Sequence, residues 1–518
     1  MKAFLMHRDQ DFDLQRELPV NEAALTQDLE LNTLCGAMAA GDAVLFELAK
    51  RGVLCSLQDP EAIVYRQQVL GDCLAQPALV RELYEIAVEA IKAEQRVWSG
   101  MYGSPTTTLN RSVQVMGLFV SALHTLRAFA DEHAAKFRSG GFSRLFAMLA
   151  TELRDEYFES IEAHLKELKF RRGVLIGLRL GRANKGVDYV LRKPVEQSWM
   201  QRFSIGSRSG YSFTISDRDE SGFKALSDLE GRGISLVASA AAQSADHILS
   251  FFTMLRAELG FYVGCLNLHE RLAELGETTC SPVPLYPGRP ALCARGLYEP
   301  CLALAVNGRV AGNDVSAEGK VLVMITGANQ GGKSTFLRSA GLAQLMMQSG
   351  MFVAAESFSA NVCDGMFTHY RREEDSTMES GKLDEELRRM SEIADRITPN
   401  SILLCNESFA ATNEREGSEI AWQVVSALTE AGVKILFVTH LFELAQRFHI
   451  QRLETALFLR AERQSDGHRT FRLLEDEPLP TSFGEDAYRK IFGTEREATA
   501  PDAPADGSKS PCTPRTAA

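Results

Sequence analysis

The chain has 518 residues, of which 45% are hydrophobic and 24% charged, values typical of a globular protein long enough for about three or four domains. A net charge of −12 excludes a protein that coats nucleic acid through overall basicity, but leaves room for a local basic surface. Ten cysteines, without a C-x-x-C pair or metal-type cluster, favour a reducing compartment. We find no secretory signal and no run of about 18 apolar residues, and therefore expect a cytoplasmic protein without a membrane span.

The first half of the chain is mostly helical in pattern. Residues 1–28 form an N-terminal arm without a clear period. Apolar residues then recur every three to four positions, which predicts helices across 29–97, 113–169 and 238–275. Asp59-Pro60 and Pro77 are typical helix starts. We expect a helical core and lever domain over 29–278.

A β-hairpin is predicted inside this domain. Apolar residues alternate over 174–180 and 187–191, and Asn184-Lys185-Gly186 supplies the turn between them. We expect further strand at Phe203, Ile205, Tyr211, Phe213 and Ile215, so that the insertion covers 171–215.

The hairpin region is locally basic. Three acidic residues, Glu167, Asp188 and Glu196, face a larger set of cations: Lys166, Lys169, Arg171, Arg172, Arg179, Arg182, Lys185, Arg192, Lys193, Arg202 and Arg208. One interpretation is the solvated face of a small sheet, and the other is a surface that contacts a nucleic-acid backbone. The scarcity of aromatic residues argues against stacking on single-stranded bases.

Prolines between 281 and 300 mark the boundary into a second domain, over 279–492. There, the apolar run Val321–Ile325 predicts a buried parallel strand. Gly327–Ser334 then fits G-x-x-x-x-G-K-[ST], the phosphate-binding loop. A chance glycine loop is the alternative, and the strand before it and the helical stripe after it count against that.

The spacing of this loop suits a triphosphate. Gly327, Gly331 and Gly332 have no Cβ, so the backbone can wrap closely around phosphate oxygens. Lys333 would reach the β- and γ-phosphates, and the hydroxyl of Ser334 would ligate Mg²⁺.

A second apolar strand, Ile402–Cys405, runs into Asn406-Glu407. Such a strand normally ends in an acidic residue that holds Mg²⁺ through water, and Glu407 is then well placed to orient or deprotonate the attacking water. Asn406 offers a neutral oxygen where a carboxylate would be charged. We therefore expect weaker metal binding and slower turnover.

A third strand, Val433–Val438, ends in Thr439-His440. Polar residues at this end of a parallel strand face the ligand crevice. His440 would sense the γ-phosphate through a hydrogen bond, or else cap the helix predicted at 441–448.

Together these segments resemble the ATPase domain of the MutS family of DNA mismatch-repair and recombination proteins. The resemblance rests on the blocks Thr326–Arg338, Leu403–Gly417 and Phe437–His440, in that order, with Thr481–Asp486 similar to the segment that closes the domain. It covers about 290–490, and extends to the helical core and lever over 29–275.

The resemblance implies an α/β P-loop NTPase domain preceded by a mostly helical core and lever domain with a small β-hairpin insertion. Glu407 would activate water, Asn406 would stand at the Mg²⁺-associated position and His440 would be the switch histidine. The loop Thr412–Gly417 would face the second copy in a homodimer. The residues that bind the phosphates of ATP would be Gly327, Ala328, Asn329, Gln330, Gly331, Gly332, Lys333, Ser334 and Thr335.

The chain departs from the family pattern in three places. No mismatch-reading domain with a Phe-x-Glu wedge precedes the helices, so we do not expect mismatch recognition of the usual kind. The DNA clamp is replaced by the shorter hairpin region. Ser376-Thr377 lies early for the family's Ser-Thr signature, so activation across the dimer would differ.

The leading hypothesis is a MutS-like ATPase that uses ATP and Mg²⁺, dimerises, and couples nucleotide state to mismatched or branched duplex DNA. The second hypothesis is a scaffold that binds ATP, hydrolyses it slowly or not at all, and contacts a protein partner through its helical arms. A small-molecule kinase fits the extra helical mass less well. Residues 493–518 have the composition of a disordered tail.

Overall fold

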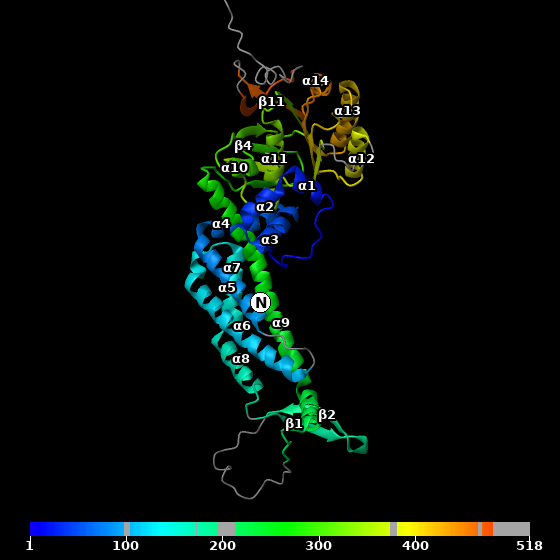
Figure 1. Ribbon diagram of the computed structural model, residues 1–518. Coiled ribbons are helices and arrows are strands. Elements are labelled where there is room, and N and C mark those ends of the chain that lie inside the picture. Colours follow the sequence, from blue (N-terminus) through cyan, green and yellow to red (C-terminus); the bar gives the residue numbers. More distant parts are fainter. Residues whose placement is uncertain (98–103, 172, 194–212, 373–380, 465–468, 480–518) are drawn as a thin grey trace, which may run out of the picture.

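The computed structural model describes residues 1–97, 104–171, 173–193, 213–372, 381–464 and 469–479. The molecule is elongated, with an α/β part at one end, a helical stalk in the middle and a β-hairpin at the far end (Figure 1). Helix α9 (Glu220–Glu274) runs along the stalk from the hairpin to the α/β part.

Three short helices lie where the stalk meets the α/β part, and the helices that follow them in the chain, up to α9, build the stalk. The junction helices are α1 (Glu22–Asp28), α2 (Leu31–Ala39) and α3 (Ala43–Leu54). The stalk helices are α4 (Pro60–Ala75), α5 (Pro77–Arg96), α6 (Pro105–His133), η1 (Ala134–Lys136), α7 (Gly140–Glu152), α8 (Asp155–Leu168) and α9.

Local sequence explains where these helices begin. The Asp59 carboxylate accepts hydrogen bonds from the first free N–H groups of α4, and proline occupies the first turn of α4, α5 and α6, where its missing N–H costs nothing. The stalk is then held by apolar contacts along α9. Phe252 of α9, for example, lies fully buried with its ring centroid 5.9 Å from that of Phe119 in α6.

Helix α9 begins 18 residues before the predicted start at 238, and this prediction was wrong. Its first turns carry Gly222, Gly231 and Gly233, residues of low helix propensity, although Phe223, Leu226 and Leu229 recur at helical spacing. This part of the helix packs against the hairpin. A Cβ at Gly233 would lie 2.5 Å from Cδ1 of Ile176 in β1. The close approach of the two elements needs a glycine at that point.

The predicted hairpin is present as β1 (Leu175–Leu180) and β2 (Gly186–Arg192), joined by the 3₁₀ turn η2 (Arg182–Asn184). Phe213 and Ile215 are not in a strand, so that part of the prediction was wrong. Phe213 is 81% exposed. Phe203, Ile205 and Tyr211 lie outside the described residues.

Two helices have an apolar window long enough to span a bilayer, within Pro105–Lys136 and Glu220–Glu274. Half of the first window and 72% of the second are buried inside the molecule. These are the windows of α6 and α9, which face each other in the stalk. Core packing therefore accounts for their apolar side chains.

A six-stranded sheet, in the order β12-β11-β6-β10-β9-β8, forms the centre of the α/β part. All neighbours in it are parallel except β11 and β12. Its strands are β6 (Leu322–Gly327), β8 (Met366–Tyr370), β9 (Ile402–Asn406), β10 (Lys434–Val438), β11 (Ala456–Arg463) and β12 (Arg469–Glu475).

Helices cover both faces of this sheet, which explains why its strands are continuously apolar. Along β6, Val323 and Ile325 pack with α11 (Lys333–Gln348) in the main hydrophobic core. Leu322 and Met324 point the other way, into a second core. The helices on that second side are α12 (Lys382–Ala394), α13 (Glu414–Glu430) and α14 (Phe442–Ile450).

A four-stranded sheet lies beside the first, in the order β3-β7-β4-β5. It contains β3 (Val283–Leu285), β4 (Leu292–Leu297), β5 (Asn313–Ser316) and β7 (Ser357–Asn361), and α10 (Pro300–Val306) follows β4. The proline-rich stretch 281–300 is thus partly strand. Sequence analysis treated it only as a boundary.

The N-terminal arm is a packed part of the fold, although its sequence shows no period. Glu258 of α9 is fully buried, and its carboxylate accepts hydrogen bonds from the backbone N–H groups of Leu5, Met6 and Phe12 at 2.5, 3.2 and 3.2 Å. Arg66 of α4, also buried, donates from Nε to the Met6 carbonyl oxygen at 2.7 Å. These two charged side chains fix the arm across the stalk.

We expect Glu258→Ala to lower the free energy of unfolding by roughly 3 kcal/mol, because three buried N–H groups lose their acceptor. Chemical denaturation measures this. The matched control is Glu274→Ala on the same helix, whose side chain is 65% exposed and whose loss should be nearly neutral. Equal effects of the two substitutions would contradict the buried role of Glu258.

Candidate functional site

The candidate site lies where three parallel strands end side by side. Ile325 of β6 pairs with Val438 of β10, and Val438 pairs with Asn406 of β9. Because the carboxyl ends of parallel strands share one edge, the residues that follow them meet there. Three segments separated by up to about a hundred residues are brought together in this way.

The glycine loop between β6 and α11 has the backbone its sequence predicts. Gly327 and Gly332 adopt φ values of +109° and +89°, a region that favours glycine. A Cβ at Gly331 would lie 2.6 Å from Cβ of Ala461 in β11. These glycines therefore allow both the turn and its close packing on the neighbouring strand.

Lys333 opens α11 and is 5% exposed. Its Nζ donates to the carbonyl oxygens of Gly327 and Ala328 at 3.0 and 2.8 Å, so the ammonium is held over the loop. Burial lowers its pKa to about 8. A cation and a helix N-terminus directed at the same loop are suited to an anion.

Ser334 and Asn406, which the sequence predicts as metal ligands, meet at this edge. The Ser334 hydroxyl donates to Oδ1 of Asn406 at 2.8 Å. A hydroxyl and a neutral amide oxygen are oxygen ligands of the type Mg²⁺ takes, although the pair lacks a carboxylate. Within the described part of the chain, no group of three His, Cys, Asp or Glu residues could hold a metal alone.

Glu407 and His440 form a direct pair, with 3.1 Å between Oε1 and Nε2. Hydrogen bonding to His440 is the main cause that lowers the pKa of the Glu407 carboxyl, and Lys333 contributes to it. Glu407 also has a φ of +55°, which is unusual for a residue with a side chain. Its N–H donates to the Val438 carbonyl oxygen at 2.9 Å, which holds that backbone in place.

Two residues at the end of β8 belong to the site and were not found from the sequence. Arg371 directly follows the strand, and its guanidinium lies 3.8 Å from Oε2 of Glu407. His369 is fully buried, with Nδ1 2.7 Å from Oγ of Ser408, so it supports the residue next to Glu407. Strand β8 itself was not predicted, and the mixed sequence F-T-H-Y-R-R gives no periodic signal.

The structure says less about the other segments that the sequence predicts to belong to the site. In the loop Thr412–Gly417, Asn413 caps α13 by accepting from the Glu416 N–H at 3.0 Å, and the described residues of this loop up to Glu416 lie at the surface. Ser376-Thr377 and Thr481–Asp486 lie outside the described residues.

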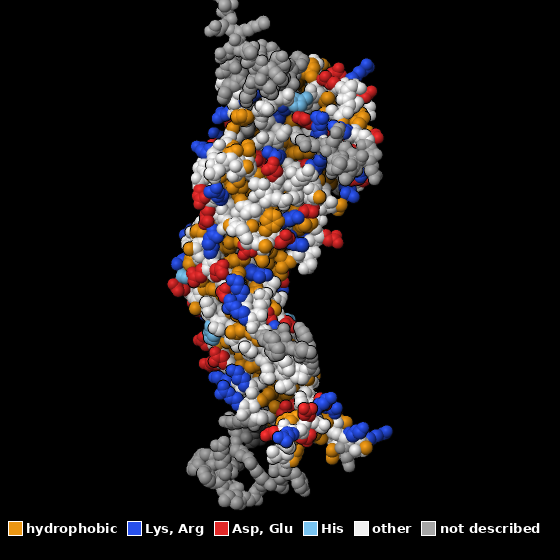
Figure 2. Space-filling view, in the orientation of Figure 1, with side chains coloured by type: hydrophobic (Ala, Val, Ile, Leu, Met, Phe, Trp, Pro, Cys, Tyr) orange, Lys and Arg blue, Asp and Glu red, His pale blue; other side chains and the backbone are white. Residues whose placement is uncertain are grey.

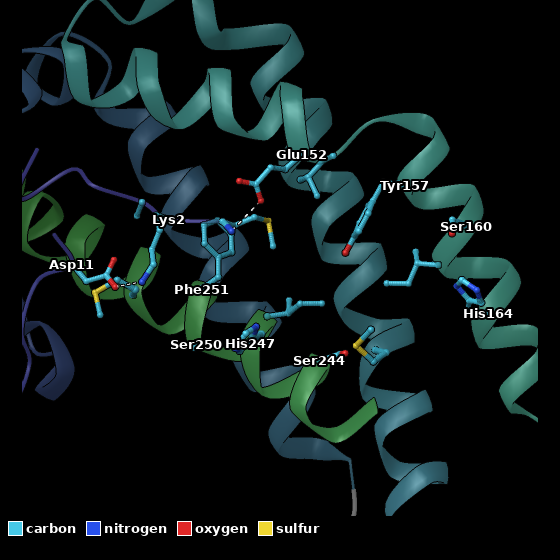
Figure 3. A pocket seen from close by; sticks show the side chains of 17 residues that line it. Lys2, Asp11, Glu152, Tyr157, Ser160, His164, Ser244, His247, Ser250 and Phe251 are labelled. Carbon is cyan, nitrogen blue, oxygen red and sulfur yellow. Dashed lines mark hydrogen bonds and ion pairs between the residues drawn. The ribbon is translucent and has the colours of Figure 1, made fainter. Parts of the chain in front are cut away.

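A further hollow lies elsewhere in the described structure, between α8, α9 and the start of the chain (Figure 3). It has a volume of about 660 Å³. Tyr157 and His164 of α8 and His247 of α9 line it without converging on one point (Figure 3). It shares no residue with the glycine loop, and we assign it no chemistry.

The strand–glycine loop–helix unit, with a second polar strand end beside it, defines an α/β protein of the phosphate-binding-loop class. Comparison with known proteins is consistent with this. The protein-family model for MutS domain V matches residues 323–493. The family model for the MutS2 N-terminal domain matches residues 58–275.

Among curated relatives, the DNA mismatch repair protein MutS of Petrotoga mobilis is 31% identical over 169 residues, which cover 32% of this chain and 21% of the relative. The MutS protein of Chlorobium phaeobacteroides is 26% identical over 365 residues, or 65% of this chain and 39% of the relative. The chain thus spans well under two thirds of these relatives' length.

The chain belongs to the MutS family. The family resemblance expected from the glycine loop, the Asn406-Glu407 strand end and the Thr439-His440 strand end is therefore confirmed. Both halves of the chain carry the family likeness, because one matched region lies in the stalk and the other contains the six-stranded sheet.

We expect Gly417→Ala to destabilise the site by about 1–3 kcal/mol, because its Cβ would lie 2.4 Å from the Phe409 carbonyl oxygen and backbone atoms must move. Thermal unfolding measures the effect. Gly71→Ala is the control, since Gly71 lies in a helix where an added methyl group would meet nothing within 4 Å, and should be neutral or stabilising. A neutral Gly417→Ala would show that the loop after β9 is adaptable.

Proposed function

We propose that this protein binds ATP with Mg²⁺ and hydrolyses it at the carboxyl edge of the six-stranded sheet. The observation that carries the proposal is the Glu407–His440 pair at 3.1 Å, beside the loop that holds Lys333. A carboxylate, a hydrogen-bonding imidazole and a phosphate-binding loop at one edge are the parts that phosphoryl transfer to water requires.

In this proposal each group has one task. Backbone N–H groups of residues 327–335 bind the β- and γ-phosphates, and Lys333 neutralises part of their charge. Glu407, kept ionised by His440, accepts a proton from the attacking water. Ser334 and Asn406 would hold Mg²⁺, which supplies charge neutralisation on the phosphate oxygens when bound.

His440 would connect hydrolysis to conformation. Its ring lies at the start of the turn into α14 and contacts Glu407, so a γ-phosphate that attracts either group would change their contact. We propose that such changes act between two ATPase domains in a homodimer and reach the stalk through α11 and the junction helices.

The hairpin is the proposed contact with mismatched or branched duplex DNA. Basic side chains project from it at the far end of the molecule (Figure 2), and Arg179 and Lys193 are 82% and 73% exposed. Exposed cations of this kind suit phosphate contacts, which position a duplex without reading its sequence. We place the protein in the cytoplasm, with a helical domain over 29–278 and the ATPase domain over 279–492.

We expect Glu407→Gln to reduce ATP turnover at least a hundredfold while ATP still binds, because the carboxylate base is lost and the phosphate loop is intact. Steady-state phosphate release and binding of a fluorescent ATP analogue measure the two properties. Lys333→Ala should abolish binding, and Glu430→Gln, at an exposed position on α13, should change neither. Unaltered turnover in Glu407→Gln would rule out the assigned role.

We expect Asn406→Asp to strengthen the dependence of ATP binding on Mg²⁺ by roughly tenfold, because a carboxylate replaces a neutral oxygen beside Ser334. The measurement is the affinity for a fluorescent ATP analogue titrated with Mg²⁺, which does not require hydrolysis. Asn413→Asp is the control, since aspartate caps a helix as well as asparagine does. Identical Mg²⁺ titrations for Asn406→Asp and the unmodified protein would contradict a metal role for Asn406.

A further inference from the structure

A fourth strand ends beside the proposed ATP site and brings an arginine to it. Strand β8 pairs with β9 in parallel, with Tyr370 beside Asn406. The residues that follow, Arg371 and Glu407, therefore stand side by side at the edge where the ligand crevice of a parallel sheet lies. The Arg371 N–H donates to the Asn406 carbonyl oxygen at 3.0 Å, which continues the ladder by one residue. The backbone of Arg371 is thus fixed relative to Glu407.

The Arg371 side chain lies near Glu407 without a hydrogen bond to it. Its Nη1 is 3.8 Å from Oε2 of Glu407, which is too far for a hydrogen bond. The other carboxylate oxygen, Oε1, already contacts Nε2 of His440 at 3.1 Å. A guanidinium has five N–H donors, and 45% of this side chain is exposed. The side chain is therefore open to a ligand in the crevice.

The terminal phosphate of bound ATP would lie within reach of this guanidinium. The Ser334 hydroxyl donates to Oδ1 of Asn406 at 2.8 Å, so the end of the glycine loop and the end of β9 border the same space. In the proposed reaction, the attacking water lies between the γ-phosphate and the Glu407 carboxylate, within hydrogen-bond reach of the latter. A phosphate oxygen one water molecule away from Glu407 is accessible to Arg371 through a change of side-chain rotamer.

The charges in the site favour this change. Glu407 carries a single negative charge and is hydrogen-bonded by His440, whereas a terminal phosphate carries a charge of about −1.5 to −2 at pH 7. A guanidinium placed between the two is drawn more strongly to the phosphate. Its departure also leaves Glu407 a stronger base, because a nearby cation favours the ionised carboxylate over the protonated one.

We propose that Arg371 is a catalytic residue that contacts the γ-phosphate of ATP, an inference that rests on the proposed ATPase function. From its position beside Glu407, the guanidinium turns to donate to a γ-phosphate oxygen when ATP is bound. In hydrolysis, the water oxygen bonds to the γ-phosphorus and the water proton passes to Glu407. The bond from this phosphorus to the bridging oxygen breaks, and its electron pair stays on ADP. Arg371 stabilises the charge on the phosphate oxygens during this step.

An arginine that only positions Glu407 would behave differently. Contact with the γ-phosphate makes Arg371 discriminate between ATP and ADP, because ADP lacks that phosphate. A positioning arginine acts through the Glu407 carboxylate, and therefore changes turnover without changing the relative affinities for the two nucleotides. Binding measurements distinguish the two roles without any need for hydrolysis.

The first test compares the affinities of the full chain, in the presence of Mg²⁺, for fluorescent ADP and for a fluorescent β,γ-imido analogue of ATP. We expect Arg371→Ala to weaken binding of the triphosphate analogue by about ten- to a hundredfold, the usual range for a hydrogen bond to a charged group, and to leave ADP binding unchanged. Arg371→Lys keeps the charge and should recover part of the loss. Arg388→Ala is the matched control, because Arg388 on α12 is 67% exposed and pairs with Glu392 at 2.9 Å.

The same loss is expected in protein that also carries Glu407→Gln. The carboxylate is absent there, so an arginine that acted only through it would no longer affect affinity. Weaker binding of the triphosphate analogue in both backgrounds supports contact with the γ-phosphate. A loss confined to protein with Glu407 intact, or an equal loss for ADP, would overturn the proposal.

The second test uses the unmodified protein, so it does not depend on a variant that folds. Modification of Arg371 and Arg388 by phenylglyoxal is followed by mass spectrometry. With the triphosphate analogue at about ten times its dissociation constant, free sites fall to about a tenth, so modification of Arg371 should slow about tenfold. ADP should not slow it, and Arg388 should respond to neither nucleotide.

The two proposals fail in different ways. Unmodified protein that binds neither nucleotide would refute the ATPase function itself and this inference with it. Protein that binds both nucleotides, but in which Arg371 is protected equally by ADP and the triphosphate analogue or by neither, would refute the role of Arg371 alone.

Discussion

Parallel pairing of β6, β10 and β9 is the constraint on which the candidate site depends. The register that places Ile325 beside Val438, and Val438 beside Asn406, aligns the three strand ends to within two residues, since β6 continues to Gly327. A shift of one residue in either ladder would turn alternate side chains to the opposite face. A shift between β9 and β10 would separate Glu407 from His440, and a shift in either ladder would move Asn406 away from Ser334.

This register is maintained by burial on both faces. Alternate residues of β6 enter two separate cores, one shared with α11 and the stalk and the other with α13 and α14. The first core continues without a break from the sheet into the helices of the stalk. Consequently the glycine loop, which begins α11, is mechanically connected to helices that reach the far end of the molecule.

Two buried charged side chains also connect the α/β part to the stalk, through the N-terminal arm. Arg66 donates to the Met6 carbonyl oxygen and, at 3.3 Å, to that of Ser349 at the end of α11, while Glu258 holds the same arm against α9. Each charge is buried only because backbone groups satisfy it. An arm with no regular structure thus joins the phosphate-loop helix to the longest helix of the stalk.

The sequence alone determined the strand–loop–helix at 322–348, the strand ends at Asn406-Glu407 and Thr439-His440, the hairpin and the family, because each depends on local spacing or on a motif whose chemistry requires certain residues. It did not reveal Arg371, His369, the packed arm or the first 18 residues of α9. Those features arise where distant segments meet, so their cause is absent from the local pattern: β8 gains its place by pairing with β9, and the arm is ordered by Glu258 some 250 residues away. The tertiary structure alone decided which polar groups found partners, since partners such as Ser334 and Asn406 are 72 residues apart in the sequence.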